Sequence, residues 1–332
     1  MKKRVVPVVI LALILFGGTC AALRWKPSQW RDVFVMPFHK DEKTAVLRLK
    51  KGQPLKAFAQ QALEKGLVVD SKNFLYWLSK KKADRSLRSG SYKVTSGPTW
   101  YVAEQLKNAE PAFYSAVIVP GAPPEKPLSL GSQAQQIAAL SDDANFPEAM
   151  RPILPKSAEA RAAFLLPETY ALVEDSVEEL IFQAADEWHK KFGAMAGDKA
   201  YALRSAIIAS LLQREALKSE EYPVIAGVIE NRLAKKMLLQ IDASVVYAWR
   251  RLTGETLTRV LYKHLEVDSP YNTYKHPGLP PSPICVPSEA AWQGALAPQK
   301  NDYYYYVAKG DGYHQFSKTQ KEHQAAVRAY RK

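Results

Sequence analysis

The chain has 332 residues, 47% of them hydrophobic, so it can bury a sizeable core and is expected to hold two folded units besides any membrane segment. Its formal net charge of +13 admits an anionic partner such as a phospholipid, a nucleic acid or an acidic polymer. The basic residues are dispersed along the chain without a nucleic-acid-binding motif, which excludes nucleic acid as the expected partner. The two cysteines, Cys20 and Cys285, fit no zinc pattern, and we expect no disulfide between them, no metal and no cofactor.

The N-terminus has the pattern of a membrane anchor. Residues 1–4, MKKR, precede residues 5–23, which contain no charged side chain and match the length of a helix that crosses a bilayer. The positive flank predicts a cytoplasmic tail over 1–4, a transmembrane helix over 5–23 and export of the remainder. The small residues at 19–22 leave a cleaved signal peptide open as the alternative.

Residues 24–44 are predicted to form a juxtamembrane linker, and residues 45–115 a small β-α-α-β module. An alternating strand precedes a turn at 52–54 and a helix whose apolar face holds Leu55, Phe58, Ala59, Ala62 and Leu63. A second helix follows, with Asp70 or Ser71 as its cap, and then an extended segment over 88–94. A further helix is predicted over 99–109.

Residues 116–332 are predicted to form a larger mixed domain, so that the fold class of the chain is α+β. A strand near 115–119 runs into a turn, a helix follows over 132–140, and the pattern is mainly helical to about residue 200. The last third predicts helices, a long proline-rich loop and a hairpin over 303–317. Tyrosines 303–306 are expected mainly to pack, because neighbours on a strand face opposite sides.

One glutamate falls on the apolar side of a predicted helix. The sector contains Ile207, Ile208, Leu211, Leu212 and Glu215. Burial disfavours the charged form of a carboxyl group, so Glu215 is expected to keep its proton near neutral pH, as a general acid for glycosidic-bond cleavage must. A structural ion pair with Arg204 or Arg232 is the alternative. Glu220 and Glu221, just before Pro223, are expected to support the next helix as cap and dipole partners.

Four ordered motifs surround this glutamate: ASLLQRE, ENRLAKKMLLQIDASVVYAW, SPYNTYKHPGLPPSPI and GYHQFSKT. Together they resemble the MltG (YceG-like) family of endolytic murein transglycosylases, over about residues 45–332 and most specifically over 209–319. The resemblance implies a LysM-like module at 45–115, a YceG-like catalytic domain at 116–332 and a catalytic role for Glu215. It also implies single-pass anchoring in the inner membrane with the bulk of the chain in the periplasm.

The activity implied is that of a lyase acting on nascent peptidoglycan glycan strands. One carboxylate suffices, because the C6 hydroxyl of N-acetylmuramic acid (MurNAc) is already attached to the ring being cleaved. Glu215 would protonate the glycosidic oxygen between MurNAc and N-acetylglucosamine (GlcNAc) and then accept the hydroxyl proton, leaving a 1,6-anhydroMurNAc end. Such cleavage is expected to terminate glycan elongation, with peptidoglycan synthases as candidate partners.

Substrate binding is assigned to eight further residues, mainly within the same motifs: Ser210, Gln240, Asp242, Tyr247, Asn272, Thr273, Tyr274 and His314. Gln240 can bond sugar hydroxyls or acetamides, and the YNTY segment combines an aromatic ring with an amide and a hydroxyl. Asp242 could instead cap the following helix. His314 could contact substrate or hold Glu215 in place.

The chain departs from the family pattern at two places. Gln213 stands where relatives often have a second glutamate, but it faces another side of the helix than Glu215, so we do not expect a loss of activity from it. Ala162–Ala163 stand where many relatives have Glu-Gly, which bears on substrate positioning or loop shape and leaves competing functions open. A non-catalytic peptidoglycan-binding scaffold is the first competitor. A muramidase that uses water, with Asp242 as base, is the second.

Overall fold

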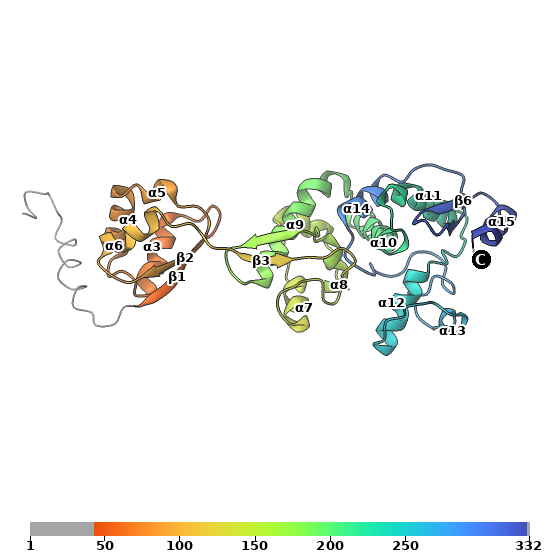
Figure 1. Cartoon of the computed structure of the whole chain (residues 1–332), viewed down its shortest axis with the longest axis horizontal. Coiled ribbons are helices and arrows are strands. Elements are labelled where there is room, and N and C mark those ends of the chain that lie inside the picture. The colour runs from red at the N-terminus through yellow and green to blue at the C-terminus, as the bar shows by residue number, and fades with distance from the viewer. Residues whose placement is uncertain (1–42, 331–332) are drawn as a thin grey trace, which may run out of the picture. The chain divides into compact units, whose positions relative to one another are not determined.

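The computed structural model describes residues 43–330, and the chain divides into two units, Met1–Tyr114 and Ser115–Lys332 (Figure 1). The division lies one residue before the predicted boundary between the small module and the catalytic domain. Within residues 43–330, no helix is both long and apolar enough to cross a membrane. The predicted tail, the anchor at 5–23 and most of the linker lie outside the described residues.

The smaller unit is built on one antiparallel pair of strands, β1 and β2, in which Thr44 faces Thr95 and Leu49 faces Gly90. The predicted order of strand, helix, helix and strand is confirmed, with a one-turn helix inserted before β2 and a further helix after it. The elements are β1 (Thr44–Leu49), α3 (Leu55–Glu64), α4 (Ser71–Lys80), α5 (Ala83–Ser86), β2 (Gly90–Thr95) and α6 (Thr99–Lys107).

The sequence determines these elements through a cap and an apolar core. The Asp70 carboxylate accepts hydrogen bonds from the backbone amides of Lys72 and Asn73, which confirms it as the N-cap of α4. Phe58 and Phe74 pack with the other large apolar side chains between the helices and the strand pair. The core is therefore complete within this unit, as expected of a separately folded module.

The two units differ sharply in charge. Residues 43–114 contain 14 Lys and Arg against 5 Asp and Glu, whereas residues 115–332 contain 25 of each kind. The basic excess that is dispersed along the sequence thus belongs mainly to the small unit and the N-terminal segment. Any positive potential in the larger unit must come from local placement of charges.

The larger unit consists of many helices with two small two-stranded sheets, β3–β4 and β5–β6. Its first half comprises β3 (Tyr114–Val117), α7 (Gln133–Ser141), η2 (Asp143–Asn145), η3 (Glu148–Ile153), α8 (Ala158–Arg161), η4 (Ala162–Phe164), β4 (Thr169–Leu172), α9 (Val177–Phe192) and η5 (Gly193–Met195). Its second half comprises α10 (Lys199–Glu215), η6 (Ser219–Glu221), α11 (Tyr222–Ala234), α12 (Asp242–Thr253), α13 (Tyr262–Leu265), α14 (Glu289–Leu296), β5 (Tyr305–Ala308), β6 (His314–Ser317) and α15 (Gln320–Tyr330).

Helix α10 is the central helix of the larger unit, in contact with α11, α12 and α14 (Figure 1). Its N-cap is Asp198, whose side chain accepts from the amide of Tyr201. The predicted apolar sector is buried, with Glu215 partly buried at its end, and small residues such as Ala206 and Ala209 are buried on other sides as well. Glu215 is the last residue of this core helix, so its position depends on where the helix ends.

The Ala162–Ala163 departure falls in the core. Both residues are fully buried, and the carbonyl of Ala163 accepts a hydrogen bond from the indole of Trp292 at 3.0 Å. Phe164 packs edge-on against Trp188, with ring centroids 4.9 Å apart. The change therefore alters packing beneath α10 and α14, and neither alanine lines the cavity described below.

Candidate active site

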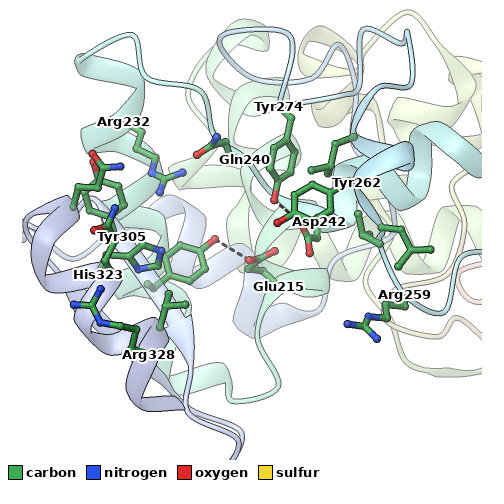
Figure 2. Close-up of a pocket in the computed structure, with 17 residues that line it drawn as sticks. Glu215, Arg232, Gln240, Asp242, Arg259, Tyr262, Tyr274, Tyr305, His323 and Arg328 are labelled. Carbon is green, nitrogen blue, oxygen red and sulfur yellow. Dashed lines mark hydrogen bonds between the residues drawn. The ribbon is translucent and has the colours of Figure 1, made fainter. Parts of the chain in front are cut away.

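A cavity of about 860 Å³ opens at the end of α10 (Figure 2). Glu215 and Tyr306 lie at its base, and the loop residue Gln240 with Asp242 and Tyr274 forms one wall. Helix α15 forms another wall, and the segment Arg259–Tyr262 forms the rim. The remaining lining residues are Arg232, Leu265, Tyr305, Gln320, His323, Gln324, Val327 and Arg328. The volume is in the range of small-ligand sites, and the lining is rich in tyrosine, glutamine and charged groups.

Glu215 is half-buried and lines the cavity. The surrounding protein desolvates its carboxyl group and raises the pKa, and the negative charge of Asp242 adds to this rise. A hydrogen bond from Tyr306 and the charges of His314 and Arg232 act in the opposite direction, and the net pKa remains raised. The carbonyl end of α10 disfavours negative charge here too, since Glu215 is its final residue.

The alternative that Glu215 pairs with Arg204 or Arg232 is wrong. Arg204 forms a two-pronged pair with Glu230, at 2.6 and 2.5 Å. Arg232 donates to backbone carbonyls, at 2.6 Å to Tyr304 and 2.7 Å to Leu239. The carboxyl of Glu215 is instead bonded by the hydroxyl of Tyr306 at 2.9 Å.

Two consecutive residues of α11 hold the chain that carries Tyr306. The amide of Asn231 donates to the carbonyls of Asn301 and Tyr303, each at 2.9 Å. Arg232 bonds the carbonyl of Tyr304, and its guanidinium lies 5.5 Å from the ring centroid of Tyr305. This part of the ENRL motif therefore fixes the entry to β5 and directs Tyr306 toward Glu215.

Gln240, Asp242 and Tyr274 lie together on one wall, as predicted for residues that line the site (Figure 2). The alternative that Asp242 caps α12 is wrong, because Ile241 is the N-cap and Asp242 is the first helical residue. The Tyr274 hydroxyl donates to Oδ1 of Asp242 at 2.5 Å. Gln240 has a positive φ of 50°, an uncommon conformation for a residue with a side chain.

Asn272 and Thr273 lie beneath this wall, which corrects the expectation that they contact substrate. The Asn272 amide donates to the carbonyls of Leu265 and Val267, both at 2.8 Å, and is fully buried. The Thr273 hydroxyl accepts from the amide of Ile241 at 2.9 Å, and its carbonyl accepts from the amide of Gln240. These two residues position their neighbours, because their polar groups are used within the protein.

Ser210 and Tyr247 are likewise buried away from the cavity, again correcting the prediction. The Ser210 hydroxyl donates to the carbonyl of Ile207 and accepts from the amide of Ile284, which joins α10 to the proline-rich loop. Tyr247 packs edge-on against Tyr271 and accepts from Arg251 at 3.1 Å. Neither side chain is among those that line the cavity.

His314 supports the site from behind. Its ring Nδ1 lies 2.8 Å from Oε2 of Glu221, and its backbone amide donates to Oε1 of the same carboxylate at 2.9 Å. The ring meets that of Tyr306 edge-on, with centroids 5.4 Å apart. His314 thus packs against Tyr306, which in turn bonds Glu215. Glu221 is the N-cap residue of α11, as predicted, but its buried carboxylate is bonded by His314 and makes no cap bond.

Sequence reasoning missed Tyr306, whose three neighbouring tyrosines favoured a packing role. Strand alternation does place Tyr304 and Tyr306 on one face, but nothing in the sequence shows which face meets Glu215. It also missed Tyr262, whose side chain is 90% exposed on the rim of the cavity, and the wall formed by α15.

Among the described residues, neither Cys285 nor the acidic side chains form a thiol-based site or a metal site. Cys285 is a free, buried thiol, and burial raises its pKa to about 12, so it remains protonated. Its Sγ donates to the carbonyl of Ser210 at 3.3 Å. Residues 43–330 contain no group of three or more His, Cys, Asp or Glu side chains arranged to hold a metal ion.

A carboxyl group at the base of a tyrosine-lined cavity is typical of enzymes that carry out acid-base chemistry on a polar polymer. The YceG-like family matches residues 47–329, and the chain belongs to this family. The chain is 33% identical over 323 residues to the endolytic murein transglycosylase of Bacillus subtilis (strain 168), an alignment that covers 89% of this chain and 87% of that protein.

Two other relatives agree with this assignment. The endolytic murein transglycosylase of Streptococcus pneumoniae serotype 2 is 31% identical over 194 residues, which cover 55% of this chain and 35% of the longer relative. The crystal structure of a yceG-like protein from Listeria monocytogenes superposes with a TM-score of 0.52 at 25% identity. That superposition covers 86% of this chain and 99% of the Listeria chain.

Proposed function

We propose that the chain is a lytic transglycosylase that cleaves the MurNAc–GlcNAc bond of peptidoglycan glycan strands and leaves 1,6-anhydroMurNAc ends. The observation that carries the proposal is the placement of Glu215, a carboxyl group with a raised pKa at the base of an open cavity. The names of the relatives from Bacillus and Streptococcus support the same reaction class. The product is formed by elimination of the leaving sugar without uptake of water, so the enzyme is a lyase.

Glu215 acts twice in this reaction. Its proton passes to the glycosidic oxygen as the bond to the MurNAc anomeric carbon breaks, and the GlcNAc-bearing half of the strand departs. The resulting carboxylate then accepts the C6 hydroxyl proton as that oxygen closes on the anomeric carbon. The intramolecular attack has a high effective concentration, so no second carboxylate is needed to activate a nucleophile.

The groups around Glu215 support both proton transfers. Desolvation keeps Glu215 protonated before reaction, while the Tyr306 hydroxyl stabilises the carboxylate formed after it. Asp242 places a negative charge where positive charge develops on the sugar ring. The rings of Tyr262, Tyr274 and Tyr305 offer apolar faces to sugars.

Hydrolysis is the second candidate reaction, because Asp242 lies in the same cavity as Glu215. With Asp242 as base, a water molecule would attack and the product would have a reducing MurNAc end. Asp242 is already the acceptor of the Tyr274 hydroxyl, which leaves one carboxylate oxygen to bind water. Mass spectrometry distinguishes the two products, since the anhydro end is lighter by one water.

The proposal extends to the rest of the chain. Residues 5–23 would anchor the protein as a single-pass protein of the inner membrane, with both units in the periplasm. The small unit would act as a LysM-like module that binds peptidoglycan, a role that its net positive charge supports, since peptide-bearing strands are anionic. Cleavage of strands as they are made would terminate their elongation, with peptidoglycan synthases as partners.

The decisive experiment compares the wild-type protein with Glu215→Gln on purified glycan strands, with released muropeptides measured by mass spectrometry. We expect anhydromuropeptides from the wild type and a loss of about a thousandfold in the variant, as for removal of a general acid. Glu220→Gln, an exposed glutamate five residues away, is the matched control and should retain activity. Anhydro products that persist in Glu215→Gln would exclude the assignment. Binding without any product from the wild type would leave a non-catalytic scaffold.

A further inference from the structure

Two arginines that make no ion pair with any described residue flank the candidate catalytic residue. Arg259 and Arg328 both line the cavity and are exposed, and they lie on opposite sides of Glu215 in Figure 2. Arg259 belongs to the rim that precedes α13, and Arg328 to the last turns of α15. Within residues 43–330, neither guanidinium makes a hydrogen bond or an ion pair. Arg251, another exposed arginine of the larger unit, is by contrast paired with the carboxylate of Glu159.

The remaining charges in the cavity are already engaged. Arg232 is buried and directs its guanidinium at backbone carbonyls. Asp242 accepts from Tyr274, and Glu215 is bonded by Tyr306 and has a raised pKa. Bonds to neutral groups leave the charges of Asp242 and Arg232 in place, but the donors of Arg232 are used within the protein, so the guanidinium groups free to bind a new anion at the cavity are those of the two flanking arginines.

This positive charge is local. The larger unit has equal numbers of basic and acidic residues, so its overall charge supplies no general attraction for anions. Two unpaired guanidinium groups on either side of a cleft give a potential that falls away within about 10 Å at ordinary ionic strength. They would act on groups of a strand that is already in the cavity.

A peptidoglycan strand has carboxylates that such arginines can bind. Each MurNAc bears a lactyl group linked to a stem peptide, and the peptide has free carboxylates beside and beyond the sugar. Guanidinium binds carboxylate through two parallel hydrogen bonds, so an arginine can select this group and orient it. A neutral sugar such as GlcNAc offers no such group.

From this geometry we propose that Arg259 and Arg328 bind carboxylates of the stem peptides of MurNAc residues on either side of the scissile bond. The inference rests on the proposed function, because it names the substrate feature that the same site recognises. The two arginines select peptide-bearing strands and hold them in register over Glu215. Neither arginine takes part in the bond-breaking step.

The test is a cross of two proteins with two substrates. The proteins are the wild type and the double variant Arg259→Gln/Arg328→Gln. The substrates are soluble, lipid-free, peptide-bearing strands and the same strands with their carboxylates converted to neutral amides by carbodiimide and ammonia. Changing the arginines alone, or the substrate carboxylates alone, should lower kcat/KM about tenfold, which corresponds to about 1.4 kcal/mol. Changing both together should cause little further loss, because each change removes the same interaction.

A matched control separates this effect from general loss of charge. Arg151 is another exposed arginine of the larger unit and does not line the cavity, so Arg151→Gln should match the wild type on both substrates. Equal activity of the wild type on native and amidated strands would overturn the inference, as would a double variant that loses the same factor on both. The substrates contain no lipid. If the arginines bind only a lipid-linked pyrophosphate, the double variant should therefore match the wild type on these strands, and this result would also overturn the inference. Absence of product from the wild type on any strand would instead refute the proposed function.

Discussion

The hydroxyl of Tyr306 donates a hydrogen bond to Oε1 of Glu215, with 2.9 Å between the two oxygens. Tyr306 lies on β5 and Glu215 at the end of α10, 91 residues apart in sequence. The bond favours the ionised carboxylate, whereas desolvation favours the neutral acid and is the larger effect. Two elements from distant parts of the chain thus set the protonation of one group.

Removing this bond should raise the pKa of Glu215 further. A general acid must be protonated to act, so its pKa sets the alkaline limb of the pH profile. Tyr306→Phe should move that limb to higher pH and lower kcat about tenfold, because the carboxylate formed during reaction loses a donor. A pH profile of anhydromuropeptide release checks both effects. Tyr303→Phe, in the same run of tyrosines, should leave the limb in place.

Neutralising Asp242 should move the same limb the other way. Its negative charge raises the pKa of Glu215, so Asp242→Asn should lower that pKa and shift the alkaline limb to lower pH. If the protein is instead a muramidase with Asp242 as base, the variant should lose nearly all hydrolysis. An unchanged limb at full activity would show that the two carboxyl groups do not interact.

Glu215 should also reduce stability at neutral pH. Its folded-state pKa is raised above the unfolded value of 4.5, so the folded protein carries no penalty below that pH and an increasing one as pH rises toward the folded pKa. Glu215→Gln should therefore unfold at a higher temperature than the wild type at pH 7.5. The difference should disappear near pH 4. The measurement is thermal unfolding of the wild type and the variant at pH 7.5 and at pH 4. An equal difference in unfolding temperature at the two pH values would show that ionisation of Glu215 is not the cause.

Arg232 is predicted to be structural more than catalytic. Replacement by lysine keeps the charge but leaves buried carbonyls of Tyr304 and Leu239 without their donor. Arg232→Lys should lower the free energy of unfolding by about 2–3 kcal/mol, the cost of an unsatisfied buried group. Activity should fall too, because the entry to β5 loosens and Tyr306 is displaced. Lys156→Gln, which changes an exposed basic residue of the larger unit, is the control for denaturant unfolding.

The sequence predicted the elements better than the contacts among them. Strand alternation and cap residues such as Asp70 are local signals, and they correctly predicted the strands and helices of the small unit and the C-terminal hairpin. Glu215 was identified from a local pattern as well. The stated reason was incomplete, because α10 is buried on most sides and the carboxyl is enclosed by residues from elsewhere in the chain.

The division between lining and supporting residues could not be predicted from motifs. Asn272, Thr273 and Tyr274 are consecutive, yet only Tyr274 reaches the cavity, because the other two satisfy backbone groups of the turn. Which of three neighbours points outward depends on the turn geometry of the loop between α13 and α14, residues 266–288. Tertiary contacts determine that geometry, and no periodicity reports it.

Helix α15 forms a wall of the cavity although none of its side chains is fully buried. In many proteins a final exposed helix tolerates truncation or a fused peptide. Here, deletion of residues 320–330 would strip Gln320, His323, Gln324, Val327 and Arg328 from the site. An affinity handle for purification is therefore better placed outside the last helix, so that a weakened preparation is not mistaken for an inactive enzyme.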